Sequence, residues 1–218
     1  MRARSLTPLV LLLCLLATGC SMFTAAAPPA PSETTSPTLA ATPTPAPADE
    51  IALSMEHMLY THDGVTETVG FDDGARVLEI FNDITGVKPE GERGTEWYTE
   101  AYIRYEWSAV TVNMSAEEMD QVVVTVSAPS VGGVPVRTVE GVTVGMTREE
   151  ATALGARPSP AEDFSDGKYP EVMELGRREV PGTESYMNDG VGIMFMTLAL
   201  EGNFISTIST GGNDYSDI

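Results

Sequence analysis

Apolar and polar positions alternate along the chain from residue 51, and this pattern predicts an opening pair of β-strands. Every second side chain is apolar or bulky through Ile51–Tyr60, and the alternation resumes at Val65–Phe71. A period of two places neighbouring side chains on opposite faces of a strand. The turn residues His62-Asp63-Gly64 lie between the two segments, so the sequence predicts a β-hairpin.

A helical period follows. From Gly74 to Thr85 the apolar side chains recur every three or four residues, which places them on one stripe of an α-helix. Asp72-Asp73 offers an N-cap, because a short carboxylate accepts hydrogen bonds from the free backbone N–H groups of a first turn. Gly86 and the following Pro89 indicate the end of this helix.

Alternation returns at Glu96–Trp107, and the sequence predicts further strands at Ala109–Met114 and Gln121–Ser127. Beyond residues 131–133 an extended Val134–Val144 leads into a second capped helix. There Thr147 and Glu150 have the spacing of a capping box, and Gly155 indicates the helix end. The remaining strands are expected near Val172–Val180, Thr183–Met187, Val191–Leu200 and Asn203–Thr210.

The two helical regions share a sequence motif. Val69-Gly-Phe-Asp72 matches Val144-Gly-Met-Thr147, and Gly86-Val-Lys-Pro89 matches Gly155-Ala-Arg-Pro158. We therefore predict an α+β fold of two tandem units, residues 50–130 and 131–218, each a short helix packed on an antiparallel β-meander. The alternative is two unrelated α+β pieces that share ordinary capping chemistry.

The first 19 residues have the pattern of a signal peptide. Arg2 and Arg4 precede an apolar run that is short for a membrane span, and the run ends at Leu16-Ala-Thr-Gly-Cys20. This ending resembles a bacterial lipobox, although Ala17 stands where leucine is usual. The resemblance implies cleavage before Cys20 and acylation of its sulfur; the alternative is an ordinary secretory signal with a chance cysteine.

Residues 20–49 are rich in Pro, Ala, Thr and Ser, which leaves too little apolar bulk to fold. At about 3 Å per residue, such a tether would hold the folded part up to roughly 90 Å from the lipid. We expect the protein at the extracytoplasmic face of the cell membrane, attached by its lipid anchor.

The charge and the cysteine content exclude several classes of function. The chain has 12 basic and 32 acidic residues, a formal net charge of −20. Nucleic-acid binding depends on Lys and Arg that neutralise phosphates, so this class of partner is excluded. The two cysteines, Cys14 and Cys20, precede the folded part, which excludes disulfides and thiol chemistry there.

The segment Val142-Thr-Val-Gly-Met-Thr-Arg148 before a short helix resembles the repeat signature of the β-lactamase inhibitor proteins. The Gly-Met-Thr turn is also similar to that of small envelope lipoproteins of the outer-membrane assembly type, and the overall layout resembles lipoproteins of high-GC Gram-positive bacteria. The resemblance implies helices layered on an antiparallel sheet. The absence of disulfides departs from the inhibitors.

In those inhibitors an acidic residue and two aromatics lie on an interface loop. Glu96-Trp97-Tyr98 has that pattern, so the resemblance implies a contact site there. The alternative is a strand entry with ordinary cross-strand packing of aromatic side chains.

Apolar residues on both faces of Val191–Leu200 suggest a second interaction surface. Met194 and Met196 share one face, which either packs under the other unit or joins Tyr98 and Tyr102 in an exposed patch. We predict from these patterns a non-catalytic protein-binding or envelope scaffold module that works through its β-sheet face.

Enzyme and carrier functions remain the alternatives. His57 and His62 point to opposite faces of a strand, and no nucleophile elbow or phosphate loop is present. Soft sulfur in Met55–Met58 suits copper, and the acidic turns at Asp72-Asp73-Gly74 and Asp163–Gly167 suit calcium, but core and turn roles explain each as well. We expect no cofactor and no metal. An envelope hydrolase, a metal-dependent enzyme, or a carrier of a metal ion or small molecule is the second hypothesis.

Overall fold

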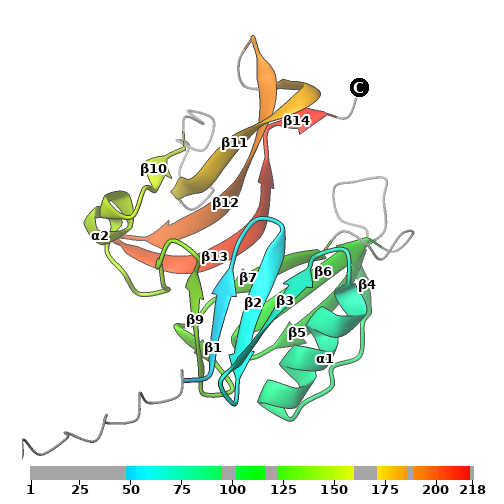
Figure 1. Cartoon of the computed structure of the whole chain (residues 1–218). Coiled ribbons are helices and arrows are strands. Elements are labelled where there is room, and N and C mark those ends of the chain that lie inside the picture. Colours follow the sequence, from blue (N-terminus) through cyan, green and yellow to red (C-terminus); the bar gives the residue numbers. More distant parts are fainter. Residues whose placement is uncertain (1–47, 95–101, 116–121, 160–170, 186–188, 217–218) are drawn as a thin grey trace, which may run out of the picture. The chain divides into compact units, whose positions relative to one another are not determined.

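The computed structural model describes residues 48–94, 102–115, 122–159, 171–185 and 189–216, all within one compact unit, Thr44–Ile218. The described helices are α1 (Gly74–Thr85) and α2 (Arg148–Ala153) (Figure 1). The described strands are β1 (Glu50–Leu53), β2 (His57–His62), β3 (Val65–Gly70), β4 (Glu92–Gly94), β5 (Tyr102–Trp107), β6 (Val110–Ser115), β7 (Val122–Val126), β8 (Ser130–Val131), β9 (Val134–Thr138), β10 (Arg157–Pro158), β11 (Val172–Ser185), β12 (Val191–Glu201), β13 (Phe204–Asn213) and β14 (Tyr215–Ser216). In this described part, neither helix is long and apolar enough to cross a membrane.

The first sheet has five strands in the order β3-β2-β1-β9-β8. Its central strand β1 runs antiparallel to β2 and parallel to β9. Ile51, Ala52 and Leu53 are all buried, because a strand in the middle of a covered sheet has no solvent face. The ion pair of Glu50 with Arg137 adds a polar contact between β1 and β9.

The second sheet has nine strands, eight of them in the order β10-β11-β12-β13-β7-β6-β5-β4, while β14 pairs with β11. The seam between β7 and β13 is short. Ile208 lies opposite Val126, and Ser209 lies opposite Thr125, with a hydrogen bond between the last two side chains. This seam connects residues from both predicted units in a single sheet.

The predicted α+β class, with two helix-on-meander units, is wrong. The protein is mostly β, its sheets are antiparallel except for the β1–β9 pair, and the described part has only two helices. The sheets also cross the expected boundary after residue 130, since β9 joins the first sheet and β13 pairs with β7. The predicted helix caps are confirmed, but a cap does not determine which surface a helix covers.

The matched motifs also differ in backbone conformation. Gly145 has a φ of 91° and lies in a turn, whereas Gly70 is the last residue of β3 and pairs with His57. The sequence correspondence therefore does not extend to these local structures.

Helix α1 confirms the predicted span. The Asp73 carboxylate accepts a hydrogen bond from the N–H of Arg76 at 3.1 Å, and Gly86 ends the helix with a φ of 67°. The buried Phe81 ring contacts Trp107 of β5, with ring centroids 5.8 Å apart, and Val77 and Ile80 are also buried. Apolar burial thus attaches α1 to the core.

Two strand predictions fail at local turns. The predicted strand Ile51–Tyr60 is broken because the Ser54 hydroxyl accepts from the N–H groups of Glu56 and His57, which closes a turn between β1 and β2. In the second sheet, Pro181-Gly182 does not separate two strands. These residues lie in an irregular section of β11, where the register with β12 shifts between Glu179 and Glu184.

Two other predictions, the first hairpin turn and the strand Glu96–Trp107, agree with the structure wherever it describes their residues. The hairpin turn at Asp63-Gly64 is confirmed, and both residues have positive φ, as a two-residue turn of this kind requires. The predicted Glu96–Trp107 strand is observed only as β5, because residues 95–101 lie outside the described residues.

Candidate functional site

A cleft opens along one edge of β11. Strand β12 pairs with β11 along its other edge from Val172 to Glu184. The cleft edge is covered near one end by β10, opposite Met173 and Glu174, and near the other end by β14, opposite Glu184 and Ser185. The cleft between them has a volume of about 860 Å³, within the range of ligand pockets. Figure 1 shows β10 and β14 near opposite ends of β11.

The irregular backbone of β11 shapes the cleft. Gly176 has a φ of 68°, and the register with β12 shifts between Leu175 and Arg178. A β-bulge of this kind re-aims side chains near a site. The arginines at 177 and 178 follow this bulge, and both line the cleft.

Glu174 is a buried charged residue of the cleft wall. Its side chain is only 4% exposed, and it accepts hydrogen bonds from Ser159 Oγ at 3.0 Å and Arg177 Nη1 at 2.9 Å. A buried carboxylate is tolerated when such a charge partner is present. Glu174 and Arg177 therefore form an ion pair in the cleft wall, and their opposite charges neutralise each other.

The second buried carboxylate of the cleft, Asp214, also has hydrogen-bond partners within the fold. One carboxylate oxygen accepts from Ser185 Oγ at 2.7 Å, and the other accepts from the N–H of Ile193 at 2.6 Å. Asp214 lies between β13 and β14 and is 8% exposed, and these two hydrogen bonds connect it to β11 and β12. Both of its carboxylate oxygens therefore accept hydrogen bonds from other residues of the fold.

Arg178 and Arg157 differ in their surroundings. Arg178 forms an ion pair with Glu56, in the β1–β2 turn, and also donates to Met194 Sδ at 3.1 Å. Arg157, on β10, is exposed and has no ion-pair partner among the described residues. Arg157 is therefore the cation of the cleft that is most available to a ligand.

The rim carries apolar surface beside this cation. Leu154 is 37% exposed and Val191 is 44% exposed, and both line the cleft. Glu140 and Glu179 add two further carboxylates to the lining. A surface that mixes apolar side chains with charges of both signs is suited to a segment of protein chain.

The described residues that line the cleft include no histidine or cysteine, the side chains most often used as base or nucleophile in catalysis. His57 and His62, the two histidines of the chain, both lie on β2. The two buried carboxylates of the described lining, Glu174 and Asp214, both accept hydrogen bonds from donors within the fold.

The three predicted interaction residues that the structure describes, Tyr102, Met194 and Met196, lie in different surroundings. Met196 is fully buried, and Met194 is half-buried against Arg178. Tyr102, at the start of β5, covers Gly94 of the neighbouring strand β4: a Cβ on that glycine would lie 2.2 Å from the Tyr102 ring. Three strands, β13, β7 and β6, separate β12 from β5. Cys20, Glu96, Trp97 and Tyr98 lie outside the described residues.

Sequence reasoning missed the cleft arginines, although two signals point to them. Glu174 interrupts an otherwise apolar run in Val172–Leu175, which indicates a buried charge that needs a partner. The following Gly176-Arg177-Arg178 places two cations beside a glycine in a chain with few basic residues. The contribution of Arg157 depends on strand pairing and has no such local signal.

A second polar cluster lies at the tip of the β2–β3 hairpin. His62 Nδ1 lies 3.0 Å from Asp49 Oδ2, and His62 Nε2 lies 3.5 Å from Asp63 Oδ2. The Asp49 hydrogen bond, together with the charge of Asp63, raises the pKa of His62, while the same hydrogen bond lowers the pKa of Asp49. Potential ligand atoms of the three side chains lie within 4.8 Å of one another, as a metal site would require. However, the two carboxylates approach different ring nitrogens, an arrangement that also suits a protonated imidazole with two ion pairs.

Comparisons with protein-family models, with curated proteins and with solved structures found no match to this chain.

Proposed function

We propose that the protein is a lipid-anchored, extracytoplasmic module that binds a partner protein without catalysing a reaction. Cys20 would carry the lipid, and the Pro-rich residues 20–49 would separate the folded part from the membrane. An inhibitor of an envelope enzyme is one form that such a binding module takes.

The observation that carries the binding role is the cleft beside β11. Its buried charges are satisfied within the fold, whereas Arg157 and the apolar rim residues Leu154 and Val191 are exposed. A partner segment that places a carboxylate at Arg157 and apolar side chains on the rim would complement this surface. The proposed binding surface is therefore the β11 edge and its surroundings.

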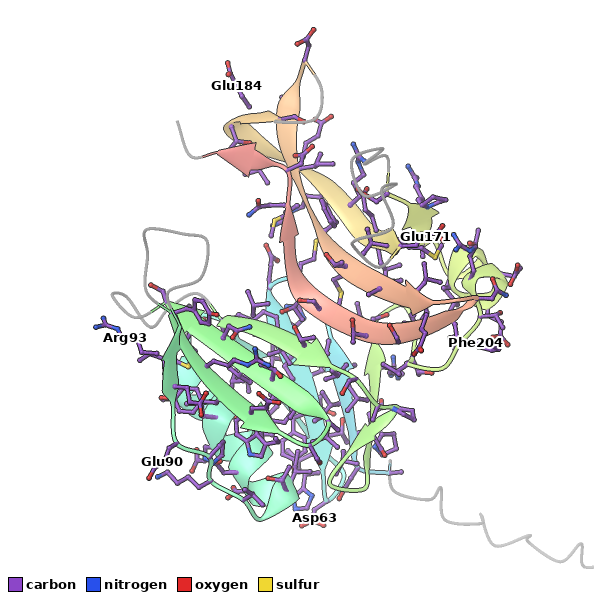
Figure 2. The ribbon with its side chains drawn as sticks, turned by 180° about the vertical axis from the view of Figure 1, so that it is seen from behind. Asp63, Glu90, Arg93, Glu171, Glu184 and Phe204 are labelled. Atoms are coloured by element: carbon purple, nitrogen blue, oxygen red, sulfur yellow. The ribbon has the colours of Figure 1, made fainter. Side chains whose placement is uncertain are left out.

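The binding proposal is tested with a photo-crosslinking residue at Val191 in the membrane-anchored full chain. We expect one partner to be captured from intact cells, and Arg157→Glu to reduce the captured amount about tenfold or more, since a like charge replaces a contact to a carboxylate. Arg93→Glu is the matched control. Arg93 is exposed on β4, well apart from Glu184 at the upper end of the cleft (Figure 2).

Equal capture by Arg157→Glu and the unsubstituted chain would contradict the role of the cleft. The anchor is tested separately with radiolabelled palmitate. We expect the label to enter the chain and to be lost in Cys20→Ser; incorporation that survives this substitution would exclude Cys20 as the lipidated residue.

A further inference from the structure

Strand β3 is the end strand of the first sheet and pairs only with β2 among the described strands. The pairing is regular through all six residues, from His62↔Val65 at the turn to His57↔Gly70 at the other end, with no bulge. The outer edge of β3 is therefore straight, in contrast to the interrupted edge of β11. Figure 1 shows β3 at the end of this sheet, beside α1.

The turn determines which backbone groups face outward. A two-residue turn makes its flanking residues, His62 and Val65, a hydrogen-bonded pair, and such pairs alternate along antiparallel strands. Val65, Glu67 and Val69 therefore direct their backbone groups toward β2, and Thr66 and Thr68 direct theirs outward. The 2.9 Å contact between the Thr61 and Thr66 hydroxyls agrees, because pairs without backbone hydrogen bonds bring side chains closest.

This edge lacks the usual protection against strand pairing. Natural edge strands carry lysine, proline or a bulge, and β3 reads Val-Thr-Glu-Thr-Val-Gly. Its one charge, Glu67, is held by Arg76 through Nε at 2.9 Å and Nη2 at 2.6 Å. Thr66 and Thr68 are exposed, and no described backbone group bonds to their outer side.

Carboxylates lie at both ends of the edge. The Asp63 side chain is 88% exposed at the hairpin tip (Figure 2). At the other end the Asp72 carboxylate lies against Gly70, where a Cβ would come within 2.2 Å of Asp72 Oδ1. The six residues between these ends span about 20 Å at 3.3 Å per residue.

We infer that β3 accepts an extended, β-branched protein segment as an added strand, with basic residues about six positions apart that meet Asp63 and Asp72. Main-chain hydrogen bonds to Thr66 and Thr68 would supply the binding energy, and the two terminal charges would set the register. A second copy of the chain is a poorer occupant, because each copy has a net charge of −20 and presents acidic ends. This surface is distinct from the β11 cleft, so a module with both could bridge two partners.

The probe is the fluorescent peptide acetyl-Lys-Val-Thr-Val-Thr-Val-Lys-amide, titrated against the full chain and followed by anisotropy. We expect saturable binding that Thr68→Pro weakens about tenfold or more, since proline removes an outward N–H and reshapes the edge. Thr68→Val keeps that N–H and should bind within about twofold of the unsubstituted chain. Asp63→Asn combined with Asp72→Asn should weaken binding and reduce its salt dependence.

Peptide methylation tests the strand geometry without changing the protein. N-methylation of the three valines and N-methylation of the two threonines block opposite edges of the peptide strand. We expect one methylated peptide to lose binding and the other to keep it. Equal behaviour of the two peptides, or equal binding by Thr68→Pro with its fold intact by circular dichroism, would overturn the inference.

Two further measurements identify the occupant and separate this inference from the cleft function. Sedimentation should show a monomer; a dimer that Thr68→Pro dissociates, with no peptide binding, would mean that the edge takes a second copy and would refute the proposed partner. Arg157→Glu should leave peptide binding unchanged. Loss of peptide binding in that variant would place the peptide in the cleft and contradict an independent β3 site.

Discussion

Helices α1 and α2 begin with similar capping chemistry but have different structural roles. The cap of α1 is the Asp73 carboxylate, and α2 has a complete capping box between Thr147 and Glu150. Yet α1 has 12 residues and buries Val77, Ile80 and Phe81, whereas α2 has six residues and buries only Ala151 among its own.

Apart from the buried Ala151, α2 is held by side-chain contacts that are polar and largely exposed. Arg148 pairs with Glu171 at 2.6 Å, and Asn203 donates to Glu149 at 2.9 Å. Exposed ion pairs contribute little to stability, whereas large buried side chains contribute several kcal/mol. A cap thus determines where a helix begins, and burial determines how much the stability of the fold depends on that helix.

The largest expected effect is on the apolar face of α1. Phe81→Ala should lower the free energy of unfolding by about 3–5 kcal/mol, because it removes a fully buried ring and leaves a cavity beside Trp107. Leu154→Ala, at the end of α2, should change it by about 0.5 kcal/mol or less. Urea unfolding followed by tryptophan fluorescence measures both. Similar losses in the two variants would show that α2 is as important to the core as α1.

Removal of the caps gives a smaller and more selective effect. Asp73→Ala should cost about 1 kcal/mol of global stability, because α1 is attached to the core. Thr147→Ala should cost about 1 kcal/mol within α2, visible as lost amide protection there, with little change in global unfolding. Hydrogen exchange by residue distinguishes the two. A lower amide protection of core strands such as β1 in Thr147→Ala would contradict this difference between the two helices.

The smallest expected effect is that of acid pH on the amide protection of the two helices. The Asn203 hydrogen bond lowers the pKa of Glu149, the Thr147 N–H lowers that of Glu150, and Arg148 lowers that of Glu171. A carboxylate whose pKa is lowered by folding stabilises the fold above its unfolded pKa of about 4.5, and this contribution is lost as pH falls through the folded pKa.

The amides of α2 should therefore lose protection below about pH 4.5, while those in the buried part of α1 retain it. Exchange rates corrected for their intrinsic pH dependence provide the measurement. A parallel loss in both helices would instead indicate that the polar contacts of α1, such as Arg76 with Glu67, matter to its stability as much as burial does.

Much of the local structure could be predicted from neighbouring residues. The α1 span, the Thr147–Glu150 capping box and the Asp63-Gly64 turn depend on hydrogen bonds and φ angles within a few positions, and all three were confirmed. The break at Ser54 was missed because alternation continued through a turn that its hydroxyl closes. Here a side-chain hydrogen bond outweighed the apolar pattern.

The candidate cleft could be predicted only in fragments. The buried Glu174 and the arginines after Gly176 stand out in the sequence, but Arg157 reaches the cleft because β10 pairs with β11. Met196 was predicted either to pack under the other unit or to join an exposed interaction patch, and it is buried. Periodicity separates the two faces of a strand, but it does not reveal which face another element will cover.

The turns, the helix ends and the acidic character of this protein follow from residue type and from neighbours along the chain, so they can be predicted without a structure. The pairing of β1 with β9 and of β7 with β13 joins residues 87 and 84 positions apart, and it is known only from the folded protein. Strands of similar composition are interchangeable as local partners, and the burial of one shared core selects among their pairings.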